Sequence, residues 1–170
     1  RVDCKECIKE SITEESLSGR HFLLVEDNDI NSEILGELLQ MRGATFVLKE
    51  NGLEAVEDFK SSTQGTYDAI LMDIQMPVMN GFELARHLKA NPETNFIPLV
   101  MVTALTDLEA RIRALDAGVD DFLSKPVDYA ELLARVNASF KVKQYHDEIM
   151  RQKREKEELL NKTLKGTIRL

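Results

Sequence analysis

The stretch AILMD at residues 69–73 sets four apolar residues directly before a carboxylate. FLLVED at residues 22–27 shows the same pattern with two carboxylates after the apolar run, and FLSK at residues 122–125 ends in a lysine. Short apolar runs of this length are typical of strands buried on both faces of a parallel sheet. Because the carboxyl ends of such strands meet at one crevice, we expect the three carboxylates and the lysine to lie close together.

The rest of the chain continues this alternation of strands and helices. The hydrophobic pattern predicts strands at about 21–26, 45–49, 69–73, 97–103 and 121–124, and helices at about 29–42, 53–62, 81–90, 107–117 and from 128 onward. Five strand–helix repeats predict right-handed crossovers and an α/β fold with a parallel sheet and helices on both faces. The doubly wound, flavodoxin-like strand order 2-1-3-4-5 matches this pattern.

Apolar spacing also predicts which helical side chains face the sheet. In each of the first two predicted helices, the helical period places the apolar residues on one face. These are Ile30, Ile34, Leu35, Leu38 and Leu39 in the first helix, and Leu53, Val56 and Phe59 in the second.

The last helix has no obvious end, because neither Pro nor Gly occurs from Ala130 to about Leu164. We therefore expect it to run on through residues 141–165. Its apolar residues Val142, Tyr145, Ile149 and Leu159 share one heptad register, which Gln152 and Lys156 interrupt. Two interpretations stay open, a solvated helical linker and a short coiled coil. We favour a homodimer formed through this helix and its extension, since Leu159, Leu160 and Leu164 need cover.

The composition and charge of the chain argue against some classes of protein. The 170-residue chain has a net charge of −8, yet residues 141–170 carry nine Lys or Arg against five Asp or Glu. The acidic remainder argues against nucleic-acid binding, and no apolar run is long enough to span a membrane. The chain begins at Arg1 and has no export signal, so we expect a cytoplasmic piece of a longer protein. Cys4 and Cys7 form a C-x-x-C, but no second metal-ligand pair accompanies it.

The residues at the strand ends suggest one chemistry. A carboxylate at Asp73 can attack a phosphoryl group to give an acyl phosphate. Asp27 and Asp73 suit a Mg²⁺ ion that keeps several waters, with Glu26 acting through one of these waters and the backbone carbonyl of Gln75 as a further ligand. Lys125 would bind a phosphoryl oxygen as a point charge.

Each of these residues also has an ordinary explanation. Glu26 and Asp27 could cap a helix, and Asp73 could form a turn before Pro77. Thr103, whose hydroxyl could donate to a phosphoryl oxygen, could be a plain strand end, and Lys125 could be a surface lysine. Their occurrence together, at four strand ends in the appropriate chain order, favours the functional interpretation.

Four strings carry a resemblance: LLVEDNDIN, ILMDIQMPVMNGFE, VMVTAL and DDFLSKP. They resemble the receiver domains of two-component response regulators over about residues 20–140. Residues 1–19 are polar and end in Leu17-Ser18-Gly19, which predicts an N-terminal linker. The resemblance makes residues 141–170 a helical or coiled-coil linker toward a missing output module.

The resemblance also implies roles for individual residues. Asp73 would be the phosphoacceptor (4-aspartylphosphate), Glu26 and Asp27 the acidic metal pair, and Lys125 the active-site lysine. Thr103 would be the switch hydroxyl, and Phe122 would stand where the family has its switch aromatic. The peptide bond between Lys125 and Pro126 is usually cis in this family.

The implied mechanism is a signalling switch with slow self-dephosphorylation, not an enzyme. A phosphohistidine of a histidine kinase or histidine phosphotransfer protein would donate to Asp73. Thr103 and Lys125 would move inward, Phe122 would fill the vacated space, and the face formed by residues 107–117, 121–124 and the last helix would change shape. Gln75 and Leu105 would flank the path of the hydrolytic water.

Two alternatives remain open. A small phosphatase with an aspartate nucleophile is disfavoured, because Ile74 and Gln75 follow Asp73 where that mechanism needs a second carboxylate. A degenerate receiver that only dimerises or docks is disfavoured by the presence of all the key residues. The first half of the chain resembles receivers of hybrid kinases, and the second half resembles stand-alone regulators. This combination is either natural or the result of an engineered joint near residues 83–96.

Overall fold

A computed structural model describes residues 17–63, 65–104 and 108–168 of the chain, so Cys4, Cys7 and Leu105 lie outside the described residues. Strands and helices alternate as predicted. In chain order they are β1 His21–Val25, α2 Asp29–Gln40, β2 Thr45–Lys49, α3 Gly52–Ser61, β3 Ala69–Met72, α4 Gly81–Ala90, β4 Leu99–Thr103, α5 Leu108–Asp116, β5 Asp121–Ser124 and α6 Tyr129–Ile168.

The five strands form one parallel sheet in the order β2-β1-β3-β4-β5, which confirms the predicted topology. Val25, at the end of β1, is in register with Lys49 of β2 and with Met72 of β3. At the other edge, Thr103 of β4 is in register with Ser124 of β5. The register therefore brings the residues that follow β1, β3 and β5 to the same end of the sheet.

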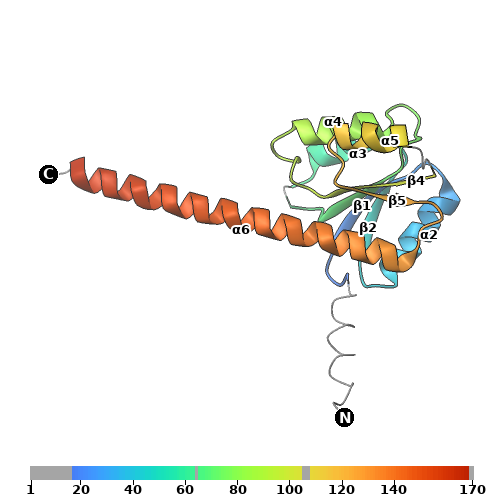
Figure 1. The fold of residues 1–170 in the computed structure, drawn as a ribbon, viewed down its shortest axis with the longest axis horizontal. Coiled ribbons are helices and arrows are strands. Elements are labelled where there is room, and N and C mark those ends of the chain that lie inside the picture. Colours follow the sequence, from blue (N-terminus) through green and yellow to red (C-terminus); the bar gives the residue numbers. More distant parts are fainter. Residues whose placement is uncertain (1–16, 64, 105–107, 169–170) are drawn as a thin grey trace, which may run out of the picture.

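Helices cover both faces of the sheet, with α3, α4 and α5 on one side and α2 and α6 on the other (Figure 1). Alternate residues of β1 serve the two cores: Leu23 and Val25 pack on the first side, and Phe22 and Leu24 on the second. This alternation follows from the period of two along a strand. Both faces are apolar, as expected of a central parallel strand.

Three helices that start near the carboxyl end of the sheet begin in the same way. Asn28, Asn51 and Asn80 are the N-caps of α2, α3 and α4, and each side chain accepts a hydrogen bond from the backbone N–H three residues later. Such caps satisfy one of the unpaired donors of the first turn. These caps place the beginnings of the helices beside the ends of β1, β2 and β3.

The predicted inward stripe of α2 was wrong in part. Leu35 and Leu39 are buried, but Ile30 and Ile34 are 68% and 49% exposed. The helix instead places Gly36 against the sheet. The two elements approach so closely there that a Cβ added to Gly36 would lie 2.5 Å from the Phe46 ring. Close approach at Gly36 turns the isoleucines outward. In α3, Leu53 is likewise exposed, whereas Val56 is buried as predicted.

Helix α6 runs without interruption from Tyr129 to Ile168, which confirms the predicted extension. Its first turns pack on the sheet through Leu132, Val136 and Phe140, and the helix then projects far beyond the body (Figure 1). Where it leaves the body, the Arg20 guanidinium lies 4.3 Å from the centre of the Phe140 ring. Among the described helices, none is both long enough and apolar enough to cross a membrane.

Candidate functional site

The site lies at the carboxyl end of the sheet, where the central strands β1 and β3 end. The backbone N–H of Asp73 donates to the carbonyl of Val25 at 3.0 Å, and that of Glu26 donates to the carbonyl of Lys49 at 3.0 Å. These bonds extend the strand pairing by one residue beyond the regular sheet. They fix the backbone of both acidic residues, so both side chains start from rigid positions.

Three carboxylates gather here as the sequence predicted. Glu26, Asp27 and Asp73 each offer an oxygen, and these oxygens lie within 4.8 Å of one another. Glu26 is only 2% exposed and Asp73 is 9% exposed, whereas Asp27 faces solvent. Oxygen donors at this spacing, open to water on one side, fit a hard divalent cation such as Mg²⁺. The donor set is therefore chemically suited to a metal ion.

Lys125 reaches this cluster from the end of β5. Its Nζ donates to Glu26 Oε2 at 2.7 Å and lies 3.3 Å from Asp73 Oδ2. The backbone N–H of Lys125 donates to the carbonyl of Thr103 at 2.9 Å, and the peptide bond to Pro126 is cis, as the resemblance implied. The lysine thus bridges the two buried carboxylates with one positive charge.

Burial has the largest influence on the pKa of Glu26 in this site. Burial raises the pKa of Glu26 above its usual value, and the nearby negative charge of Asp73 raises it further. The hydrogen bonds from Lys125 and from the backbone of Asn28 act in the opposite direction. A buried carboxylate with a raised pKa is stabilised in its charged form by any added cation. Three carboxylates and one lysine meet in this cluster, so a bound cation would stabilise the charged form of Glu26.

The orientation of Asp73 depends on a close backbone approach that the sequence reasoning missed. Asp73 Oδ1 accepts the backbone N–H of Ile74 at 2.7 Å, and the N–H of Gly81 donates to the carbonyl of Ile74 at 3.0 Å. A Cβ on Gly81 would lie 2.4 Å from the Asp73 carbonyl oxygen. Only glycine allows the start of α4 to approach this closely. The signal in the sequence was Asn80-Gly81 directly before a helix.

The remaining predicted residues lie around this cluster in different environments. Thr103 is buried at the end of β4, next to the strand that leads to Lys125. Phe122 is in register with Met101 and is half-buried against the core beneath α3, α4 and α5. Gln75 is exposed two residues after Asp73. The structure thus brings Glu26, Asp27, Asp73 and Lys125 together, and it places Thr103 at the same end of the sheet.

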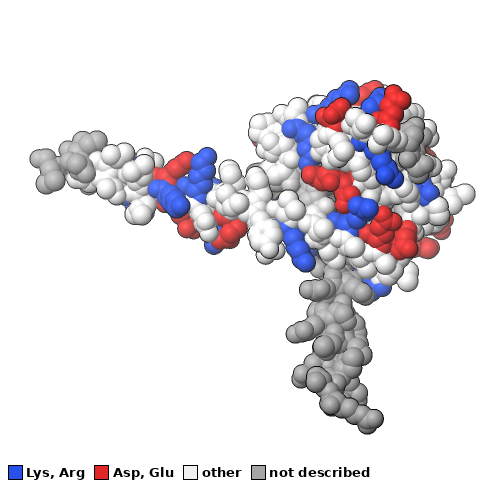
Figure 2. Space-filling model, in the orientation of Figure 1, with Lys and Arg blue, Asp and Glu red and all other residues white. Residues whose placement is uncertain are grey.

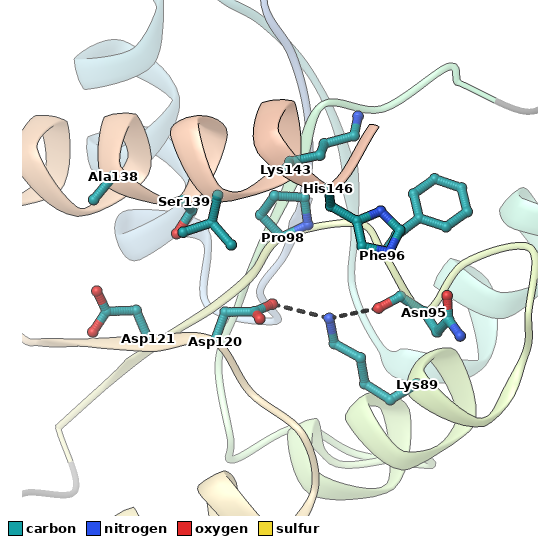
Figure 3. A pocket seen from close by; sticks show the side chains of 11 residues that line it. Lys89, Asn95, Phe96, Pro98, Asp120, Asp121, Ala138, Ser139, Lys143 and His146 are labelled. Atoms are coloured by element: carbon teal, nitrogen blue, oxygen red, sulfur yellow. Dashed lines mark hydrogen bonds and ion pairs between the residues drawn. The ribbon is translucent and has the colours of Figure 1, made fainter. Parts of the chain in front are cut away.

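A hollow also lies elsewhere, at the amino ends of β4 and β5 beneath α6. It has a volume of about 540 Å³. The Lys89 amine at its floor is already held by Asp120 at 2.9 Å and by the carbonyl of Asn95 at 3.0 Å (Figure 3). None of the predicted site residues lines it. The chemistry is therefore expected at the acidic cluster and not in this hollow.

Residues 22–137 match the family model of the response regulator receiver domain. The chain is 38% identical over 113 residues to the hybrid signal transduction histidine kinase L of Dictyostelium discoideum, covering 65% of this chain and 7% of that protein. It is 38% identical over 114 residues to the transcriptional regulatory protein CusR of Escherichia coli, covering 67% of this chain and 48% of that protein. The chain thus spans less than half the length of either relative.

Solved structures agree with this match. The receiver domain of the sensor histidine kinase PA1611 from Pseudomonas aeruginosa, which has a magnesium ion coordinated in its active-site cleft, superimposes with a TM-score of 0.66 at 32% identity. That comparison covers 73% of this chain and 99% of the other.

Proposed function

The chain belongs to the response regulator receiver domain family, and from this we propose that Asp73 accepts a phosphoryl group from a phosphohistidine of a two-component partner. The partner is a histidine kinase or a histidine phosphotransfer protein. The proposal is carried by one observation: the Asp73 carboxylate lies beside the Lys125 amine and within a cluster of two further carboxylates. That arrangement supplies both a nucleophile and the charges that a phosphoryl group needs.

The transfer requires positioning and charge neutralisation more than covalent help from the protein. A carboxylate oxygen of Asp73 forms a bond to phosphorus while the bond from phosphorus to the histidine nitrogen breaks. The Ile74 N–H holds Oδ1, and the Lys125 amine faces Oδ2 and is placed to bind a phosphoryl oxygen. Thr103 is the second proposed donor to the phosphoryl group, from the end of β4.

Magnesium is the proposed cofactor, held by Glu26, Asp27, Asp73 and the backbone carbonyl of Gln75. Support comes from the spacing of the carboxylate oxygens and from the magnesium ion in the cleft of the similar PA1611 receiver domain. When bound, such an ion neutralises the negative charge of the phosphoryl oxygens. The Lys125 amine supplies a further positive charge beside Asp73.

The output is a change of shape on the face formed by α5, β5 and α6. In this proposal Thr103 and Lys125 move toward the phosphoryl group, and Phe122 turns into the space that Thr103 leaves. Phosphorylation then shifts a population between two states because the phosphoryl group contacts them differently. Hydrolysis resets the switch, and Gln75 and Leu105 tune its rate. The protein acts as a cytoplasmic signalling switch, without binding nucleic acid or membrane through this segment, and forms a homodimer through α6.

Intact-mass spectrometry tests the proposal. The protein is incubated with Mg²⁺ and acetyl phosphate, and we expect the mass of one added phosphoryl group. The label should be absent in Asp73→Asn and present in the matched control Asp116→Asn, which changes an exposed aspartate of α5.

Each other outcome assigns a different function. Folded protein that takes up no label would leave a degenerate docking module. Rapid multiple turnover of varied phosphoesters would indicate the phosphatase alternative. Label that persists in Asp73→Asn would move the acceptor to another residue.

A further inference from the structure

Helix α6 carries an apolar stripe that nothing in the described part of the chain covers. After Phe140, the side chains of α6 leave the core, and Val142 and Leu159 are 69% and 67% exposed. Tyr145 and Ile149 are exposed in the same way. Large apolar side chains exposed along one helix indicate an interaction surface.

The exposed residues follow a heptad. We define the outer stripe of α6 as the successive a and d positions from Val142 to Leu159, which are Val142, Tyr145, Ile149, Gln152, Lys156 and Leu159. The next two positions of the heptad, Thr163 and Gly166, carry no large apolar side chain, so the stripe ends at Leu159. Successive helical residues are rotated by about 100°, so this stripe lies roughly half a turn away from the core-facing residues Leu132, Val136 and Phe140. Most of the outer stripe therefore points away from the core, and only Val142 at its base borders the hollow beneath α6.

The body of the domain offers no cover for the base of the outer stripe. Val142 lines the hollow beneath α6 together with Phe96, yet its side chain remains 69% exposed. Farther along, the exposed helix carries mixed acidic and basic side chains in its middle, with uncharged stretches on either side (Figure 2). None of the residues that the structure describes covers these apolar ends.

We propose that α6 pairs with α6 of a second copy as a parallel, in-register, two-stranded coiled coil, in which Gln152 and Lys156 set the register and keep the association weak. This deepens the homodimer that is part of the proposed function. Polar residues at single core positions of a coiled coil specify register and oligomeric state while lowering stability. Apolar layers at Val142, Tyr145 and Ile149 precede the polar pair, and Leu159 follows it.

The charges beside the stripe favour the parallel arrangement. In parallel pairing, Glu148 of one copy lies at a g position facing Lys153 at the e position of the other, and Glu155 lies next to Lys156 of the other copy. All four side chains are exposed and free to exchange partners, although Glu148 pairs with Arg151 within one copy. Opposite charges therefore meet along both edges of the parallel pair, whereas the two Lys156 side chains face each other in its core and weaken the association.

The antiparallel alternative brings like charges together. The antiparallel register that also aligns the apolar residues sets Val142 against Leu159 of the second copy. It then places Glu148 beside Glu155 of that copy and buries Lys156 against Tyr145. Like charges at facing flanking positions disfavour a pairing, so the sequence selects against this orientation.

Disulfide trapping tests the orientation in the full 170-residue chain. With Cys4 and Cys7 changed to Ser, Ile149→Cys should form a disulfide-linked dimer on mild oxidation, because parallel pairing sets each residue against itself. Arg154→Cys, at an f position on the outside of the pair, is the matched control and should stay monomeric. Monomer for both variants, or equal cross-linking of both, would overturn the proposal.

Analytical ultracentrifugation tests the role of the polar pair. Lys156→Ile should lower the dimer dissociation constant by about tenfold or more. Arg154→Ile makes the same change of side chain on the outer face and should leave that constant unaltered. An unchanged constant for Lys156→Ile would refute the assignment of Lys156 to the interface. Labelling of Asp73 is measured separately, so a monomer that still accepts phosphate would refute the pairing alone.

Discussion

Arg135 of α6 and Asp121 of β5 are joined by an ion pair of 2.6 Å between Nη1 and Oδ1. The same Asp121 oxygen accepts the backbone N–H of Phe122 at 2.8 Å, so one carboxylate links the long helix to the residue proposed as the switch aromatic. Glu131, one turn earlier in α6, holds the Arg135 guanidinium from the other side at 3.0 Å. The helix that projects from the domain is thus tied directly to the strand expected to respond to phosphorylation.

Breaking this link should loosen the contact between α6 and β5 without unfolding the protein. Both side chains are partly exposed, so Arg135→Gln should lower the free energy of unfolding by about 1 kcal/mol or less. Hydrogen exchange should accelerate at Phe122 and in the first turns of α6. Arg151→Gln, which removes a pair within the exposed extension, is the control and should leave Phe122 exchange unchanged. Equal effects of both variants would rule out a specific link.

Removal of the proposed phosphoacceptor should leave the fold intact. Asp73→Asn keeps an oxygen that can accept the Ile74 N–H and removes a negative charge beside Glu26. It also removes one of the two carboxylates on Lys125, but Glu26 remains at 2.7 Å. We expect the free energy of unfolding in metal-free buffer, measured by urea denaturation, to be unchanged or higher, because relief of the repulsion between two carboxylates offsets the lost contact with Lys125. A large drop in melting temperature would contradict this account of the site.

Magnesium should stabilise the folded chain, because a ligand that binds only the native state raises the free energy of unfolding by mass action. We expect the melting temperature to rise with Mg²⁺ concentration and the rise to be largely lost in Asp27→Asn. Asp29→Asn changes an exposed aspartate two residues later, outside the cluster, and should retain the response. The same ionic strength supplied as sodium chloride serves as the salt control. An equal response in both variants would show that the ion binds elsewhere.

Gly81→Ala should be strongly destabilising, because its Cβ would meet the Asp73 carbonyl oxygen and the Ile74 Cα, which are backbone atoms that cannot move aside. Overpacking of this kind costs about 1–3 kcal/mol. Gly166→Ala is the control, since nothing lies within 4 Å of its added Cβ and α6 is helical there. That variant should be neutral or more stable by up to about 1 kcal/mol. Urea denaturation of both variants would decide the matter, and a neutral Gly81→Ala would refute the close approach.

Tyr67 should make the free energy of unfolding depend on pH in the alkaline range. Its hydroxyl donates to Asp58, and burial, followed by this hydrogen bond, raises the pKa of Tyr67 above its usual value. A hydrogen bond to a carboxylate contributes about 1.5–3 kcal/mol, so Tyr67→Phe should lower the free energy of unfolding by a similar amount near neutral pH. Tyr129→Phe is the control, because the buried Tyr129 hydroxyl has no hydrogen-bond partner among the described residues, and its removal should not lower the free energy of unfolding.

The sign of the pH effect follows from the raised pKa. The folded state holds the Tyr67 proton more tightly than the unfolded chain, in which the pKa of tyrosine is about 10. The stabilisation is therefore complete below about pH 10 and is lost as the pH rises through the pKa of the folded state. The difference in stability between the natural protein and Tyr67→Phe should shrink in that range. A difference that stays constant as the pH rises would show that the Tyr67 proton is not involved.

The sequence by itself determined the order of the strands and helices, the residues at the strand ends and the length of α6. Apolar runs, helical periodicity and the absence of Pro or Gly after Ala130 are local signals, and each reports burial or backbone preference within one element. The resemblance added roles for Glu26, Asp27, Asp73 and Lys125, and the structure brings these four residues together.

Only the tertiary structure decided how the elements meet. Lys125 bonds to Glu26, which lies 99 residues earlier, and no local pattern indicates that partner. Gly36 and Gly81 set close approaches that turn Ile30 and Ile34 toward solvent and hold the Asp73 backbone against α4. The ion pair between Arg135 and Asp121 arises in the same way. Such contacts depend on which surfaces of two packed elements face each other, and this is fixed by the shapes of side chains distant in the sequence.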